Sequence, residues 1–193
     1  MTRDEFVDLA ELLVKNIRVE LTNDPQLGER AYLIPITNMI NLLLPKNDLN
    51  IDRRQDAVKA IINCLASMYC MVVTKYISPK PLFSLLKDIK EMVRFILTKK
   101  GNEYSGDDDR LIHFKEFREM FGYDEDIAAI IWMLKHIVSI KMMVERKVPG
   151  IDDILTVNEK FIDAINYCIL LYALYEERKG VTIKKSKEEN NGS

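Results

Sequence analysis

Residues 156–178, TVNEKFIDAINYCILLYALYEER, decide the fold, because they predict a long helix that is apolar on almost every side. A helix of this kind has to be buried, so other elements must surround it. Thr156 followed by Glu159 is typical of a capping box at the start of a helix, and Gly180 predicts its end. The stretch therefore predicts the central element of a helical protein.

A line of polar residues crosses this apolar helix. Glu159, Asp163 and Asn166 follow the spacing i, i+4 and i+7, so they share one face, and Tyr167 lies beside them. A carboxylate that is buried without a partner is costly, which makes pairing or metal binding the usual solution. The line therefore predicts a polar contact inside the core.

The preceding helix, predicted over residues 124–147, is also apolar on most sides and carries Lys135, His136 and Ser139 close together. Two buried helices with polar lines suggest that the lines face each other or a shared cleft, a usual ligand site in helical bundles. The alternative is a buried Lys135–Asp163 ion pair that only fixes the register of the two helices. His136, taken alone, is more typical of a satisfied core histidine.

The rest of the chain predicts further helices and no strand, which makes the protein an all-α helical bundle; these helices cover 2–19, 34–43, 52–76, 83–100 and 111–121. The prolines in Ser78-Pro79-Lys80-Pro81 bar a continuous helix and predict a boundary. We therefore expect an N-terminal helical region over 1–78, a second helical domain over 79–180 and a disordered polar tail over 181–193. Arg53-Arg54 is expected in a solvated first helical turn, with an anion or partner contact as the alternative.

Composition narrows the classes of function. The net charge of −2 argues against nucleic acid as a required partner, because nucleic-acid binders usually carry a basic excess. The three cysteines lie in apolar helical segments and predict buried, reduced thiols. The N-terminus has no signal-peptide core, and no apolar run approaches the roughly 20 residues that span a bilayer. We therefore expect no membrane partner and a cytoplasmic protein, in the host cytoplasm if it is viral.

Residues 99–119, KKGNEYSGDDDRLIHFKEFRE, combine two glycines with acids and aromatic residues. Glycines allow backbone amides to approach a ligand, and the oxygens of Asp107–Asp109 suit Mg²⁺. The alternative is a helix start with favourable acids. Glu116 and Glu119 share one face at i, i+3 and could present two carboxylates to one metal ion, although this spacing also arises by chance on surface helices.

Three segments together resemble one family. KKGNEYSGDDDRLIHFKE, WMLKHIVSI and EKFIDAINYCILLYAL resemble the successive motifs of phage-type MazG-like proteins and the related nucleotide-modification-associated domains, over residues 84–178. The resemblance implies a compact all-α bundle that is often a homo-oligomer. It also implies a nucleotide ligand, and in catalytic relatives a Mg²⁺ ion and a water that attacks a nucleoside triphosphate between its α- and β-phosphates.

The resemblance assigns roles residue by residue. Glu159 and Asp163 match the catalytic carboxylates of the closing helix, and Glu116 and Glu119 would join them as Mg²⁺ ligands. The nucleotide contacts would come from Lys99, Tyr104, Arg110, His113, Lys135, His136, Asn166 and Tyr167. The chain departs from the active pattern, ExxE followed by ExxD, because its second acidic pair is spaced four apart and Asn166 stands where another acid could serve. This departure affects catalysis more than nucleotide binding.

Three functions compete. The first is a Mg²⁺-dependent nucleoside triphosphate pyrophosphohydrolase of phage or viral nucleotide metabolism, which requires its four carboxylates to gather. The second is a nucleotide sensor or sponge without turnover, with a basic and aromatic site that includes Lys135 and His136. The third is a structural helical protein that oligomerises through residues 1–78, in which the polar lines pair internally.

Overall fold

A computed structural model describes residues 1–22, 27–45, 47, 49–104, 109–146 and 151–191, with no side-chain detail for 100–104, 146 and 181–191. All regular structure in these residues is helical, which confirms the all-α prediction. The helices are α1 (Arg3–Lys15), α2 (Arg30–Leu43), α3 (Ile51–Val72), a π-helical turn η1 (Val73–Ile77), α4 (Leu82–Tyr104), α5 (Ile112–Phe121), α6 (Glu125–Arg146) and α7 (Ile154–Asn191).

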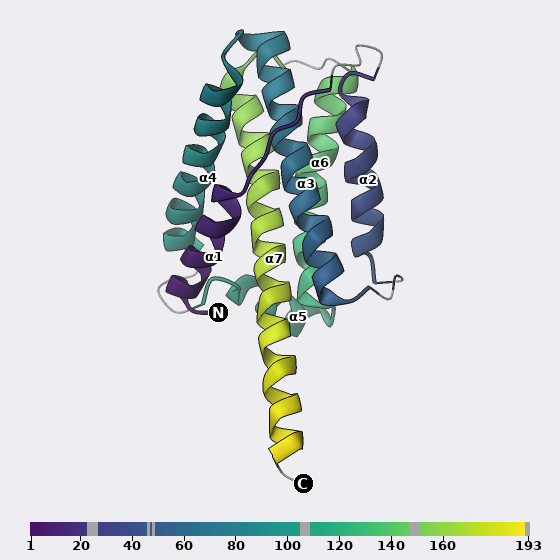
Figure 1. Cartoon of the computed structure of the whole chain (residues 1–193), viewed down its shortest axis with the longest axis vertical. Helices are drawn as coiled ribbons and strands as arrows, with labels where there is room; N and C mark the ends of the chain where they lie inside the picture. Colours follow the sequence, from purple (N-terminus) through teal and green to yellow (C-terminus); the bar gives the residue numbers. More distant parts are fainter. Residues whose placement is uncertain (23–26, 46, 48, 105–108, 147–150, 192–193) are drawn as a thin grey trace.

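Helix α7 runs through the middle of the bundle, and the other helices surround its first two thirds (Figure 1). It packs most extensively against α6 and α3, and also meets α4 and α1. Phe161, Ile165 and Cys168 of α7 are completely buried, as the all-round apolar pattern predicted. One hydrophobic core includes residues from both sides of the predicted boundary at 78–81, where the chain does leave the helical conformation.

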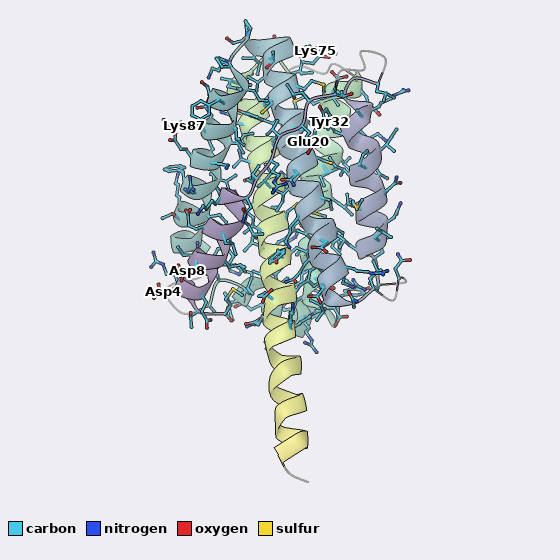
Figure 2. The ribbon with its side chains drawn as sticks, viewed as in Figure 1. Asp4, Asp8, Glu20, Tyr32, Lys75 and Lys87 are labelled. Atoms are coloured by element: carbon cyan, nitrogen blue, oxygen red, sulfur yellow. The ribbon has the colours of Figure 1, made fainter. Side chains whose placement is uncertain are left out.

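The chain between α1 and α2 is fixed across α3 by hydrogen bonds. Helix α1 begins with a capping box of Thr2 and Glu5. After α1, the backbone N–H of Glu20 donates to Ser67 Oγ over 3.0 Å. The Tyr32 hydroxyl donates to the Glu20 carbonyl over 3.1 Å, and the two residues lie together where this linker crosses α3 (Figure 2). The linker therefore has a defined path over α3.

Several helix ends differ from the predictions. Helix α4 continues through Gly101 to Tyr104, and α7 continues through Gly180, so the tail predicted to be disordered is helical up to Asn191. Helix α7 also begins earlier than predicted, because Asp153 accepts hydrogen bonds from the backbone N–H groups of residues 155 and 156 and so takes the capping role predicted for Thr156. Gly122, with φ of 72°, ends α5 as predicted.

Among the described residues, two helical segments, Ile51–Ile77 and Glu125–Glu145, are long and apolar enough to span a bilayer by length and composition, in contrast to the expectation that no apolar run approaches that length. The core helices of a bundle meet the same criterion. In the structure, 67% and 50% of the two most apolar windows lie buried among the other helices.

Candidate functional site

The polar lines of α6 and α7 meet through His136 and Asp163. Both side chains are buried, and His136 Nδ1 lies 3.9 Å from Asp163 Oδ2, an ion-pair distance when the imidazole is protonated. Lys135, the neighbour predicted to pair with Asp163, is exposed on the other side of α6. The predicted Lys135–Asp163 pair is therefore wrong, because one residue along a helix turns the side chain by about 100°.

Aromatic rings lie beside the His136–Asp163 pair. The Tyr167 ring stacks on the His136 ring, with centroids 5.4 Å apart and planes 26° apart. Trp132 of α6 meets Tyr167 edge-on at 5.8 Å and contacts Phe114 of α5 at 5.2 Å. Helix α5 therefore covers one end of the row of rings formed by Phe114, Trp132 and Tyr167. Tyr167, which is only half-buried, connects this row to His136.

Asn166 is the unusual member of this region. Its side chain is 6% exposed, and neither Nδ2 nor Oδ1 has a hydrogen-bond partner among the residues that the structure describes. A buried amide without partners costs about 1–3 kcal/mol, so each such group calls for an explanation. We refer to His136, Asp163, Asn166 and Tyr167 together as the seam. Asn166 and Asp163 lie one helical turn apart on α7, so the unpaired amide adjoins the buried pair.

The four carboxylates predicted to hold Mg²⁺ do not gather. Among the described residues, no group of three or more His, Cys, Asp or Glu side chains could hold a metal ion. Glu116 and Glu119 are exposed on α5, and Glu116 lies 3.3 Å from His113 Nδ1. Glu159 is also exposed and lies 2.7 Å from Lys160 Nζ. Only Asp163 is buried, and it faces an imidazole, so this donor set does not fit the predicted Mg²⁺ site.

The predicted contacts from residues 99–113 are dispersed. The Lys99 ammonium lies 5.9 Å from the Phe95 ring centroid near the end of α4. The Tyr104 side chain and Asp107–Asp108 fall outside the described residues. Arg110 is buried, donates to the Leu97 carbonyl and covers the Phe6 ring at 5.4 Å. Burial lowers the pKa of Arg110, and its contacts tie the start of α5 to α4 and α1.

A second polar region was missed at the end of the bundle where α3 begins. We call it the basal junction: Arg54, Gln55, Asp126, Glu176 and Arg178. The Arg54 guanidinium donates to the carbonyls of Leu43, Asn47 and Leu49 over 2.9–3.1 Å. It also lies 4.0 Å from buried Asp126, which Arg178 contacts at 3.1 Å, while Gln55 donates to Glu176 over 2.5 Å.

The expectation of a solvated Arg54 is therefore wrong, because this side chain turns inward and binds the carbonyls of the turn between α2 and α3. The only available signal was a pair of arginines soon after the polar turn, and that pattern is equally typical of a solvated helix start.

A third polar group joins Lys115 to Asp109 at 2.7 Å and to Glu177 at 3.1 Å. This ion-pair cluster anchors α5 to α7.

The seam offers recognition more readily than covalent chemistry. Cys168 of α7 is completely buried, its Sγ lies 3.3 Å from Met133 Sδ, and burial raises the pKa of its thiol, so it is a poor nucleophile. Burial likewise raises the pKa of Cys70 to about 12. What the seam provides is an amide with a free donor and acceptor beside an imidazole, a carboxylate and two aromatic rings.

No protein-family model matches this chain, and neither the curated proteins nor the solved structures contain a match. The MazG-like resemblance thus stands on the three sequence motifs alone.

Proposed function

We propose that this protein binds a nucleotide at the seam and does not hydrolyse it with a metal ion. The observation that carries the proposal is Asn166, which is buried with both amide groups unpaired. An asparagine amide presents one donor and one acceptor side by side, a pattern that matches the edge of a nucleobase. A base bound there would satisfy an amide that otherwise carries a desolvation cost.

The neighbours of Asn166 suit the same class of ligand. Tyr167 and Trp132 supply aromatic faces and edges, on which bases stack. His136 and Asp163 add two polar groups 3.9 Å apart, and the His136 ring is stacked on the Tyr167 ring. Because Tyr167 is the only half-buried member of the seam, a ligand would enter by displacing its ring. The three nucleotide-related motifs of the sequence support the same choice of ligand.

The hydrolase takes second place because the carboxylates it needs are apart: Glu116, Glu119 and Glu159 are exposed, and only Asp163 is buried.

Self-association of the protein remains part of the proposal. The outward side of α6 exposes Ile131, Val138 and Met142 at helical spacing, an apolar surface that a second copy could cover.

A nucleotide panel tests the proposal, with thermal unfolding and chromatography as readouts, in Mg²⁺ and in EDTA. We expect at least one nucleotide at saturating concentration to raise Tm by roughly 5 °C or more, equally in both buffers and without product. Asn166→Leu should remain folded and lose this shift, whereas Asn38→Leu, at an exposed position of α2, should keep it.

Two results would change the conclusion. Mg²⁺-dependent product that disappears in Asp163→Ala would establish the hydrolase instead. Equal nucleotide shifts in the wild type and Asn166→Leu would show that binding takes place away from the seam.

A further inference from the structure

A cleft separate from the seam opens between α1 and α3, with α7 behind it. Its volume is about 360 Å³, within the range of small-molecule sites. In Figure 1 the ribbon of α7 is visible between these two helices, below the point where the linker after α1 crosses the bundle. Apart from Tyr172 of α7, the residues that line the cleft belong to the N-terminal half of the chain, outside the region of the MazG-like motifs.

The floor of the cleft is apolar and its sides are cationic. Leu13, Ile62 and Tyr172 are buried and form the floor. Arg18 and Lys59 line the sides, and none of the lining residues is acidic in the part of the chain that the structure describes. Both cations are exposed at the protein surface, so a ligand can reach them without rearrangement of the core.

Arg18 is held at the cleft through its backbone, and Lys59 through its ammonium group. The backbone N–H of Arg18 donates to Asn63 Oδ1 over 3.0 Å, which fixes the linker on α3. The Lys59 ammonium lies 5.4 Å from the Tyr172 ring centroid and 3.3 Å from Asp56. Burial alone would lower the pKa of Lys59, but the hydrogen bond to Asp56 and the nearby Tyr172 hold it above its usual value, so Lys59 is charged at neutral pH.

Amide groups complete the site. Asn16 and Asn63 line the cleft beside the two cations. Asn16 uses its Nδ2 for the Leu12 carbonyl, at 2.9 Å, and Asn63 uses its Oδ1 for Arg18. The Nδ2 group of Asn63 therefore adds a neutral donor to the two charged ones, an arrangement that favours an anionic acceptor such as a carboxylate or a phosphate.

We propose that this cleft binds a small amphipathic anion, with its carboxylate or phosphate group between Arg18 and Lys59 and its apolar body on Leu13, Ile62 and Tyr172. The cleft offers the anionic group of such a ligand two cations, and it offers the apolar body a buried apolar floor. Neither a neutral apolar molecule nor an amphipathic cation would use the two positive charges.

Calorimetric titration of the full chain with matched eight-carbon and six-carbon probes tests this inference. We expect octanoate or hexyl phosphate to bind, and 1-octanol and hexyltrimethylammonium not to bind. Arg18→Ala and Lys59→Gln should each weaken binding roughly tenfold, the effect of one charge-assisted hydrogen bond.

Arg53→Ala is the matched control, because Arg53 is an exposed arginine of α3 outside the cleft, and it should leave anion affinity unchanged. Circular dichroism checks that each variant is folded. Equal affinity for the anions and for 1-octanol, or equal affinity of Arg18→Ala, Lys59→Gln and the wild type, would overturn the inference. Binding of nucleotides at the seam has no bearing on this outcome, since Asn166→Leu leaves the cleft intact.

Discussion

The basal junction and the seam both include residues of α6 and α7, to which the basal junction adds Arg54 and Gln55 of α3, and both bring charged groups into the core. In the basal junction Arg54 reaches three backbone carbonyls, and Asp126 lies beside two guanidinium groups. In the seam Asp163 faces His136, while the amide of Asn166 is buried with neither atom bonded. Buried polar groups are usually paired, so the unpaired amide of Asn166 calls for an explanation, which a bound ligand would supply.

The largest effect is expected from Arg54→Met in the basal junction. This change removes three hydrogen bonds to the carbonyls between α2 and α3 and one cation near Asp126, so we expect a loss of about 3 kcal/mol in the free energy of unfolding. Urea denaturation measures it. Arg53→Met, at the exposed neighbouring position, should change stability by no more than about 0.5 kcal/mol. Similar values for the two variants would mean that Arg54 is a surface arginine in solution.

The opposite sign is expected in the seam. Asn166→Leu replaces an unpaired amide with an apolar group of similar size, so without ligand the free energy of unfolding should stay equal or rise by about 1 kcal/mol. Urea denaturation again provides the value, with Asn38→Leu as the exposed control. A loss above about 1 kcal/mol would show that Asn166 has a structural partner, and the contrast between seam and basal junction would then disappear.

The helical architecture followed from local rules, which explains why it could be predicted. The apolar periodicity of α6 and α7, the Thr2–Glu5 capping box and the stop at Gly122 each depend on residues close together in the sequence. Gly101 and Gly180 were predicted to end helices and do not. Glycine disfavours a helix by only about 1 kcal/mol, and it ends one reliably only where the backbone turns left-handed, as at Gly122.

The candidate site was predicted less well because its contacts join distant helices. Helix α6 is apolar both inward and outward, since Ile131, Val138 and Met142 are exposed, so its pattern could not show whether Lys135 or His136 faces α7. Asp163 and Asn166 were identified because polar residues on an all-apolar helix are conspicuous. Arg54 was missed because its acceptors belong to the turn before α3, and only the folded chain brings those carbonyls to one guanidinium.

The smallest effect, and one with a defined pH dependence, is expected from Asp109→Asn in the ion-pair cluster with Lys115 and Glu177. Burial alone would raise the pKa of Asp109, but the hydrogen bonds from Lys115 and from the Leu111 N–H hold it below its usual value. A carboxyl group whose pKa is lower in the folded than in the unfolded protein stabilises the fold at every pH above its unfolded pKa, which is about 3.9 for aspartate. This stabilisation is lost as the pH falls through the lower pKa of the folded protein.

Asp109→Asn should therefore lower the free energy of unfolding at pH 7 by less than about 1 kcal/mol, because Lys115 keeps Glu177. The difference from the wild type should persist down to about pH 4 and fade below it. Urea denaturation from pH 2 to 7 gives the profile, with Asp8→Asn on the outward side of α1 as a control that stays within about 0.5 kcal/mol at every pH (Figure 2). A difference that grows as the pH falls would mean that the carboxyl of Asp109 is stabilised in its neutral form. In that case the basal junction would still differ from the seam in having its charged groups paired, but the ion-pair cluster of Asp109, Lys115 and Glu177 would not.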